Sequence, residues 1–412
     1  MYTNAVAGPY TESCVLVGFC DPNPGRLEMA RGRLPEGYPD VGLYAEGEFD
    51  RMIEDTKPET VVVTSKDSTH HKYIVRAMAL GCDVICEKPL TTDAEKAQAI
   101  VDVKKKTGRE LTVTHNARYS PSRAQVRRLL QDGVIGEVLS VELRWLLSTS
   151  HGADYFRRWH RRRENSGGLI VHKATHHFDL VNWWIGSSPV KVSAFGTRQY
   201  YLPETGDALG LTDRTDRCHT CPHARDGSCK FALNMEKSEA LKAMYLDQEQ
   251  FDGYHRDACI WDPEIDIEDT MNLVVQYASG ATMSYSLNAF APWEGYNVAF
   301  NGSRGRLEHS VVEDAGAFGE AEAHMIHKGT VTRVFPHFAS PRDEEVWKSE
   351  GGHGGGDAPL LEVLFGNGLS EDDTLGQAAG LEEGIASILT GIAANRAMAT
   401  GTVVDTACLV KL

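Results

Sequence analysis

The sequence has no run of about 18 apolar residues, the length that a membrane-spanning helix requires. Its first residues, MYTNAVAGPYTES, lack the basic start and apolar core of a secretory signal. Basic residues are few, since 42 Lys and Arg stand against 58 Asp and Glu, for a formal charge of −16. Nucleic acids and anionic membranes attract basic surfaces, so both kinds of partner are disfavoured. We expect a cytoplasmic protein that binds neither nucleic acid nor membrane.

The chain has 412 residues, which is long for one ordinary domain and suits two domains with sizeable cores. Hydrophobic residues make up 42% and charged residues 24%, a balance that predicts folded domains rather than disorder. Nine cysteines are present. An odd number, with several in apolar segments, is typical of reduced thiols in a cytoplasm.

Short apolar segments alternate with helical patterns over the first 116 residues. The expected strands cover 15–21, 60–65, 82–89 and 111–116. The segments between them show helical spacing, N-terminal caps or closing glycines. This alternation predicts a Rossmann-type, doubly wound parallel sheet.

The pattern changes at about residue 117. Apolar residues alternate along 137–148, and two more such strands flank a turn at Ser279 and Gly280. A long helix is expected over 167–186. We therefore predict an α/β dinucleotide-binding domain over 1–117. We predict an α+β domain over 118–412, with a large, mostly antiparallel open sheet and a cysteine-rich insertion at about 213–262.

The sequence lacks the usual beginning of a dinucleotide-binding fold. In such a fold a glycine-rich turn follows the first strand, and an acid at the end of the second strand binds the ribose. Asp21, which ends VLVGFCD, suits that acid, but neither a GxGxxG nor an apolar strand precedes it. The first strand and its turn are therefore expected to be missing. One explanation is a start assigned too late or a shortened chain, and the other is lost dinucleotide binding.

Several motifs follow one another along nearly the whole chain. They are DPNPGRLEMA (21–30), VVVTS (61–65), STHH (68–71), CEKPL (86–90), THNARY (114–119), SGGLIVHKATHHFD (166–179) and GIAANRAMATG (391–401). In this order and spacing, the sequence resembles the glucose–fructose oxidoreductase/inositol dehydrogenase (Gfo/Idh/MocA) family. The resemblance implies NAD or NADP in the first domain. It also implies a sugar, cyclitol or sugar derivative as substrate at the domain boundary.

Lys88 lies just beyond an expected parallel strand, where ligands bind in open α/β sheets. Its ammonium, with Glu87 beside it, can hydrogen-bond a substrate hydroxyl and relay its proton; a surface lysine is the alternative. By resemblance His176 is the general base, and His172 stands where many members have aspartate. A histidine pKa of about 6.5 suits proton acceptance. On one helix the two would share a face, and Lys173 is a compensating charge for the replaced aspartate.

Two other roles stay open for these histidines. Together with His177 they suit a metal site, although no HExxH motif is present, or a structural role. The remaining candidates are these. Cofactor contacts are expected from Thr64, Ser65, His70, Glu87, Lys88 and Asn116, and substrate contacts from Arg118, Asp154, Tyr155, His160, Lys173, His177 and Asp179. The arginines at 157, 158 and 161–163 suit an anionic substrate, a solvated face or a subunit contact. The loop HGGGD (353–357) suits a turn or a pocket lid.

NAD is the expected cofactor. A carboxylate at Asp21 favours the free 2′-hydroxyl of NAD and repels the 2′-phosphate of NADP. The next residues, Pro22 and Asn23, place no arginine there to receive that phosphate.

Cys218, Cys221, Cys229 and Cys259 lie in the polar insertion. Four thiolates with a C-x2-C half-site suit a tetrahedral structural zinc. An iron–sulfur cluster needs the same ligands, and His219 or His223 could replace one cysteine. Free thiols are the alternative, with disulfides less favoured in a cytoplasm.

The expected activity is hydride transfer between nicotinamide and a hydroxyl-bearing carbon of a sugar, glycoside or cyclitol. One alternative is a glycoside-cleaving enzyme that oxidises, eliminates and re-reduces without net redox change. Another is a non-catalytic binder of a sugar or a partner protein. The resemblance also implies a homodimer or homotetramer, formed through the open face of the second sheet.

Overall fold

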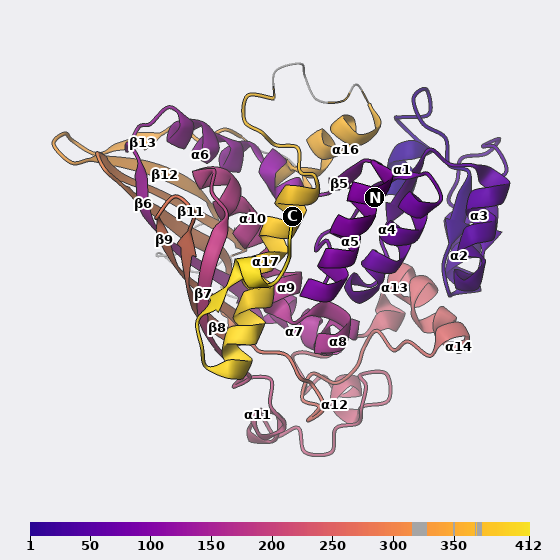
Figure 1. Cartoon of the computed structure of the whole chain (residues 1–412). Helices are drawn as coiled ribbons and strands as arrows, with labels where there is room; N and C mark the ends of the chain where they lie inside the picture. Colours follow the sequence, from indigo (N-terminus) through magenta and orange to yellow (C-terminus); the bar gives the residue numbers. More distant parts are fainter. Residues whose placement is uncertain (315–327, 349–350, 367, 369–372) are drawn as a thin grey trace.

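The computed structural model describes residues 1–314, 328–348, 351–366, 368 and 373–412. Its first part contains two small parallel sheets (Figure 1). One pairs β1 (Gly18–Cys20) with β2 (Gly42–Tyr44), and the other has the order β3 (Thr60–Val63), β4 (Asp83–Cys86), β5 (Leu111–Val113). No hydrogen-bonded pairing joins β1 to β3 in the described residues, so the parallel strands form two sheets rather than one.

One helix precedes these strands and others alternate with them, as the sequence pattern predicts. They are α1 (Tyr2–Val6), α2 (Pro24–Arg31), α3 (Phe49–Thr56), α4 (His70–Ala79) and α5 (Ala94–Thr107). The α5 helix begins where the Asp93 side chain accepts the Lys96 N–H, and it ends at Gly108, whose φ of 68° favours glycine. In β4, Val84, Ile85 and Cys86 are all buried, as expected for a strand covered on both faces.

The second part is built on a nine-stranded sheet. Its order is β13-β12-β11-β10-β6-β9-β8-β7-β14, and every pair is antiparallel except β6 with β9. The strands are β6 (Val138–Ser148), β7 (Pro189–Thr197), β8 (Thr270–Tyr277), β9 (Thr282–Ala291), β10 (Glu294–Gly302), β11 (Gly305–Asp314), β12 (Gly329–Pro336), β13 (Arg342–Glu344) and β14 (Val404–Asp405).

Helices cover one face of this sheet (Figure 1). Those of the second part are α6 (Pro121–Gln131), α7 (Thr149–Arg157), α8 (Arg163–Ser166), α9 (Leu169–His172), α10 (Ala174–Ile185), α15 (Gly352–Gly355), α16 (Asp357–Phe365) and α17 (Leu381–Thr400). Along β8, buried Leu273 and Val275 alternate with exposed Asn272, Val274 and Gln276. One face is therefore core, and the other is open.

The long helix expected over 167–186 is divided. Leu169–His172 and Ala174–Ile185 form separate helices with Lys173 between them. The N–H of His176 bonds to the Lys173 carbonyl, three residues back, instead of to that of His172. His172 and His176 therefore lie on successive helices rather than on one face of a continuous helix.

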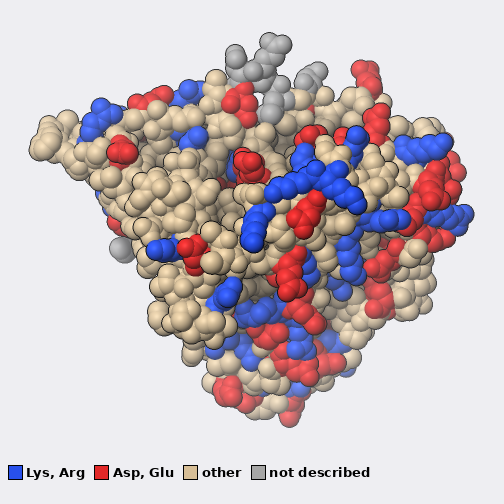
Figure 2. Space-filling view, in the orientation of Figure 1, with Lys and Arg blue, Asp and Glu red and all other residues tan. Residues whose placement is uncertain are grey.

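The cysteine-rich insertion carries the short helices α12 (Pro222–Arg225), α13 (Glu239–Met244) and α14 (Glu249–Asp252), and α11 (Pro203–Ala208) lies just before it. It runs below the large sheet, and α13 and α14 reach the first part near α2 (Figure 1). There Arg26 pairs with Asp252 at 2.7 Å, and the Asn23 amide bonds to the Gln248 carbonyl. Figure 2 shows acidic and basic side chains intermixed over this lower region. The insertion thus bridges the two parts of the chain.

The Rossmann-type fold with parallel strands and the second part with its mostly antiparallel sheet are confirmed. The boundary at 117/118 stays a prediction. Among the helices of the described residues, none is both long and apolar enough to cross a membrane.

Candidate active site

Lys88 lies two residues beyond the end of β4, and Glu87 precedes it. Its Nζ donates to the carbonyl oxygen of His172 at 3.3 Å, so the loop after β4 meets the end of α9. Burial lowers the pKa of Lys88, and the charges of Asp67 and Glu87 oppose this change. The ammonium is therefore partly desolvated but lies beside carboxylates that stabilise it.

Asp67 is an active-site residue that was missing from the sequence-based candidates. It follows β3 by four positions, is 4% exposed, and its Oδ2 lies 2.5 Å from Nδ1 of His172. Burial raises the pKa of Asp67, with Lys88 opposing, while burial lowers the pKa of His172. The signal available in the sequence was an acid just after a parallel strand, where ligands bind. The Asp67 carboxylate thus faces both His172 and Lys88.

His176 is almost fully buried at the start of α10. Its Nδ1 has no hydrogen-bond partner within the described part of the chain. Burial lowers the pKa of His176 well below its ordinary value, and Lys88 and Lys173 lower it further. These effects favour the neutral imidazole, and its Nδ1 is left unsatisfied among the described residues. We call Asp67, Lys88, His172 and His176 the Lys88 site.

Tyr155 and His160 bring aromatic rings to the Lys88 site. Their ring centroids lie 5.5 and 4.1 Å from that of His172. The Tyr155 hydroxyl lies 3.0 Å from Nε2 of His151, whose Nδ1 lies 2.5 Å from Oε1 of Glu294. Tyr155 and His160 therefore lie beside His172, and their contact with substrate stays a prediction. His151 and Glu294, which lie outside every motif, were missed because only the fold joins α7 to β10.

The HGGGD loop also reaches the Lys88 site. The ring of His353 lies 6.4 Å from that of His176, and its Nδ1 lies 3.0 Å from Asp357. Asp357 in turn accepts a hydrogen bond from the Asn116 amide at 2.7 Å. The carbonyl oxygen of the Asn116 side chain is buried and has no partner in the described ranges. A loop distant in sequence therefore lies beside the expected base.

The remaining cofactor candidates lie at or near the ends of β1, β3 and β4. Asp21 follows β1, its Oδ1 accepts the Asn23 N–H at 2.8 Å, and burial raises its pKa. Thr64 is exposed, and the Ser65 hydroxyl accepts a bond from Thr69. His70 is buried between the carbonyl oxygens of Ser65 and Pro89, at 3.0 and 2.8 Å, and so ties the two loops together. Glu87 accepts a hydrogen bond from the Tyr2 hydroxyl at 2.6 Å.

Other substrate candidates are occupied by protein partners. Arg118 and Asp179 form a buried two-point pair, with Nε–Oδ2 and Nη2–Oδ1 distances of 2.8 and 2.7 Å. His177 stacks on Trp145 and bonds to Tyr285, as a core histidine does. The geometry gives no support to a substrate contact for these three, whose roles stay predictions.

For Asp154 and Lys173, unlike Arg118, Asp179 and His177, the geometry is compatible with a substrate contact. Asp154 lies within 4 Å of three arginines, with its shortest contact 2.8 Å from Arg256. The Lys173 ammonium lies 5.9 Å from the Trp145 ring centre, and burial lowers its pKa to about 8. Both remain candidates for substrate contacts.

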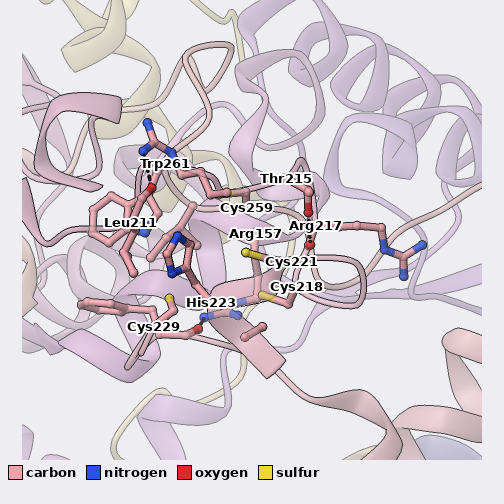
Figure 3. Close-up of a pocket in the computed structure, with 14 residues that line it drawn as sticks. Arg157, Leu211, Thr215, Arg217, Cys218, Cys221, His223, Cys229, Cys259 and Trp261 are labelled. Atoms are coloured by element: carbon pink, nitrogen blue, oxygen red, sulfur yellow. Dashed lines mark hydrogen bonds between the residues drawn. The ribbon is translucent and has the colours of Figure 1, made fainter. Parts of the chain in front are cut away.

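The four cysteines of the insertion line one cavity (Figure 3). All nine cysteines of the chain are free thiols. In the side-chain positions that the structure gives for the described residues, no three His, Cys, Asp or Glu groups converge on one metal position. A metal site formed by the three adjacent histidines therefore has no geometric support, because His177 turns toward the sheet.

Family comparisons match both parts of the chain. Residues 3–115 match the oxidoreductase family's NAD-binding Rossmann fold, and residues 127–406 match its C-terminal alpha/beta domain. This is a Gfo/Idh/MocA family oxidoreductase. Membership confirms the resemblance drawn from the motifs.

The names of relatives in this Gfo/Idh/MocA family differ in how closely they specify an activity. The chain is 39% identical over 387 residues to "Putative oxidoreductase YteT" of Bacillus subtilis, covering 91% of the chain and 87% of that protein. It is 27% identical over 176 residues to D-glucoside 3-dehydrogenase of Escherichia coli, covering 43% and 48%. The solved structure of an Agrobacterium radiobacter oxidoreductase with NAD+, L-tartaric acid and magnesium superposes with a TM-score of 0.64 at 14% identity, covering 99% and 96%. The last likeness concerns the fold.

Proposed function

We propose that this family member is an NAD-dependent dehydrogenase that oxidises a hydroxyl-bearing carbon of a sugar, glycoside or cyclitol. The observation that carries the proposal is the buried, unpartnered Nδ1 of His176, in the described residues, beside Lys88 and the Asp67–His172 pair. A neutral imidazole next to a desolvated ammonium is suited to accept a hydroxyl proton. The dehydrogenase names of the relatives agree with this substrate class.

In the proposed mechanism, the substrate hydroxyl lies between Lys88 and His176. Lys88 donates a hydrogen bond to the substrate oxygen, and His176 accepts its proton. Asp67 holds His172 by the 2.5 Å contact and partly offsets the charge of Lys88. The Asp67 carboxylate thereby provides the negative charge that many family members place at position 172. Its position four residues beyond β3 compensates for the histidine at 172.

The chain presents residues suited to NAD. When bound, the nicotinamide accepts hydride from the substrate carbon. Asp21, at the end of β1, would bind the ribose hydroxyls, and Thr64 and the unpaired Asn116 carbonyl group (in the described ranges) would contact the nicotinamide half. The carboxylate of Asp21 favours NAD over NADP. A 2′-phosphate would meet both it and nearby Asp252, although Arg26 is also close.

The decisive experiment is to incubate the chain with NAD and a panel of cyclitols, aldoses and methyl glucosides, and to follow NADH. We expect net NADH with at least one substrate, equimolar with the oxidised product. Glycoside cleavage without NADH would indicate oxidation followed by re-reduction. Binding of sugar without either product would indicate a non-catalytic protein.

We also propose that a second copy covers the open face of the large sheet. Phe195 of β7 is 80% exposed, and Val274 of the neighbouring strand β8 is 55% exposed. The two residues are diagonal neighbours on paired strands, and exposed apolar side chains placed in this way favour a protein contact over water. Sedimentation should give a homodimer or homotetramer for the chain and a smaller species for Phe195→Glu. A monomeric parent chain would contradict this assembly.

A further inference from the structure

The cysteine-rich insertion forms a cavity that the proposed reaction does not use. Three separate segments meet there (Figure 3). The Cys218 N–H bonds to the Asp257 carbonyl at 2.9 Å, and the Cys259 N–H bonds to the Asp216 carbonyl at 2.7 Å. These bonds and the isolated antiparallel bridge between Arg217 and Ala258 hold the first and last cysteines on two segments that lie side by side. The fold therefore brings together thiols that are about forty residues apart along the chain.

The other two cysteines enter on tight turns. The Cys221 N–H bonds to the Cys218 carbonyl at 3.2 Å, which closes the C-x2-C turn, and α12 begins directly afterwards. The Cys229 N–H bonds to the His223 carbonyl at 3.0 Å. The Leu233 N–H points at the sulfur of Cys218, 3.4 Å away. Backbone N–H donors of this kind stabilise a thiolate more than a thiol.

The cavity is also lined by one buried cation, Arg157, that is short of acceptors. Arg157 is only 5% exposed; its Nη2 donates to the Phe231 carbonyl at 2.9 Å, but its Nη1 has no hydrogen-bond partner in the described residues. The carboxylate that it pairs with among those residues, Asp154, is shared with Arg158 and Arg256. A buried guanidinium facing neutral thiols is poorly stabilised, whereas one facing thiolates is well stabilised.

His223 adds a second unsatisfied group to the cavity. Its Nδ1 lies 2.9 Å from the Ser228 hydroxyl. Its Nε2 is buried without a partner among the described residues, so this ring nitrogen is unsatisfied in either tautomer. The Nε2 of His223 and the Nη1 of Arg157 therefore both line a cavity that has four thiols as its potential anions.

We propose that Cys218, Cys221, Cys229 and Cys259 bind one structural zinc ion as a tetrathiolate, with Arg157 and His223 donating to its sulfur atoms. Four thiolates around Zn²⁺ carry two net negative charges, which supplies the missing counterion. Binding releases the thiol protons, and rotation about the Cα–Cβ bonds turns the sulfur atoms toward one centre.

The zinc would fix an insertion that touches both parts of the enzyme. Arg157 belongs to α7, which also carries Tyr155 of the active site, while Asp252 pairs with Arg26 beside Asp21. The ion would thus hold the segment that joins the substrate side to the cofactor side. It has no role in the proposed hydride transfer, so its test is separate from that of the dehydrogenase.

The experiment is elemental analysis of the full chain purified without a metal-affinity tag. We expect about one zinc per chain, retained through dialysis. The Cys218→Ser/Cys221→Ser double variant should lose it. Cys408→Ser, an exposed cysteine outside the insertion, is the matched control and should retain it. His223→Ala should also retain zinc, and loss in that variant would overturn the tetrathiolate.

A thiol titration tests the zinc proposal without variants, so its outcome does not depend on how well a variant folds. In the unaltered chain, chelator treatment should make four additional thiols reactive, and zinc should be released at the same rate as these thiols appear. Reactivity unchanged by chelation, with no zinc in the protein even after growth in zinc, would overturn the proposal. Iron with acid-labile sulfide would overturn it in favour of a cluster.

Discussion

The Lys88 site and the cysteine cavity both place ionisable side chains in the protein interior, but they balance charge differently. At the Lys88 site the ammonium is offset by Asp67 and Glu87. In the cysteine cavity, Arg157 shares one carboxylate with two other arginines, and neutral thiols face it. A buried unpaired polar group costs about 1–3 kcal/mol, and a buried unpaired charge costs more. The first site is therefore balanced within the chain, while the second is suited to an added ion.

The two regions also differ in what their unpaired atoms offer. Among the described residues, His176 leaves one ring nitrogen without a partner beside Lys88, whereas Arg157 leaves guanidinium N–H groups without an acceptor. An unpaired acceptor in a pocket suits a substrate that arrives with a hydroxyl group. Unpaired donors around thiols suit a resident metal thiolate. The difference is consistent with the catalytic role that we propose for the Lys88 site and the structural role that we propose for the cysteine cavity.

Removal of the reacting groups should have the largest effect. Lys88→Met and His176→Ala should each lower kcat/KM by about 10²–10⁴-fold, because each removes a positioned proton-transfer group. Steady-state NADH formation measures this. Lys104→Met, which removes a surface lysine paired with Glu110, is the matched control and should be close to the parent. Unchanged turnover in either active-site variant would remove that residue from the mechanism.

Asp67→Asn tests whether the carboxylate in the loop after β3 offsets the positive charge of Lys88. The amide keeps the shape but loses the charge, so kcat/KM should fall by about 10–100-fold, as for other residues that orient a catalytic group. We also expect the pKa of Lys88 to fall further, since Asp67 now raises it. The basic limb of the pH–rate profile should therefore shift to lower pH. A profile identical to the parent's would assign Asp67 to structure alone.

Arg157→Gln sharpens the comparison at the cysteine cavity. Loss of the buried cation should weaken zinc binding by about 10–100-fold in competition with a chromophoric chelator, because groups that contact metal ligands contribute on this scale. Arg76→Gln removes an exposed arginine paired with Asp50 and should leave zinc affinity unchanged. Equal affinity for the Arg157 variant and the control would show that the guanidinium does not stabilise the site.

The smallest effect concerns the acid limb of activity. Burial lowers the pKa of His176, so the proton-accepting form persists below the ordinary histidine value of about 6.5 and is lost only at lower pH. In the oxidative direction, log kcat/KM should stay level down to pH 6.5 and decrease only at a lower pH. A midpoint above 6.5 would show that the base is another group or that its environment stabilises the charged imidazole.

Much of the fold was predictable because its signals are local. Continuous apolar segments predicted the parallel strands, and alternation in β8 and β9 predicted the half-open antiparallel sheet. The division of the expected long helix at Lys173 was not predictable. The segment 167–186 has no proline and no internal glycine after Gly168 that would mark a break.

The site was predictable only where a motif carries it. Lys88 and His176 follow from short motifs, and position after a parallel strand could have indicated Asp67. His151 and Glu294 come from segments that meet only in the folded chain, whereas the HGGGD loop was indicated as a turn or a pocket lid and places His353 beside His176. The sequence also gave Arg118 and Asp179 as separate candidates, whereas the fold pairs them with each other.

The central claim is best tested by one measurement, NADH formation by the chain with NAD and a cyclitol and glycoside panel, with Lys88→Met run in parallel. The account predicts net NADH, matched by oxidised product and lost in the variant. Tight NAD binding with no NADH from any substrate, or NADH formation that the variant retains, would contradict it.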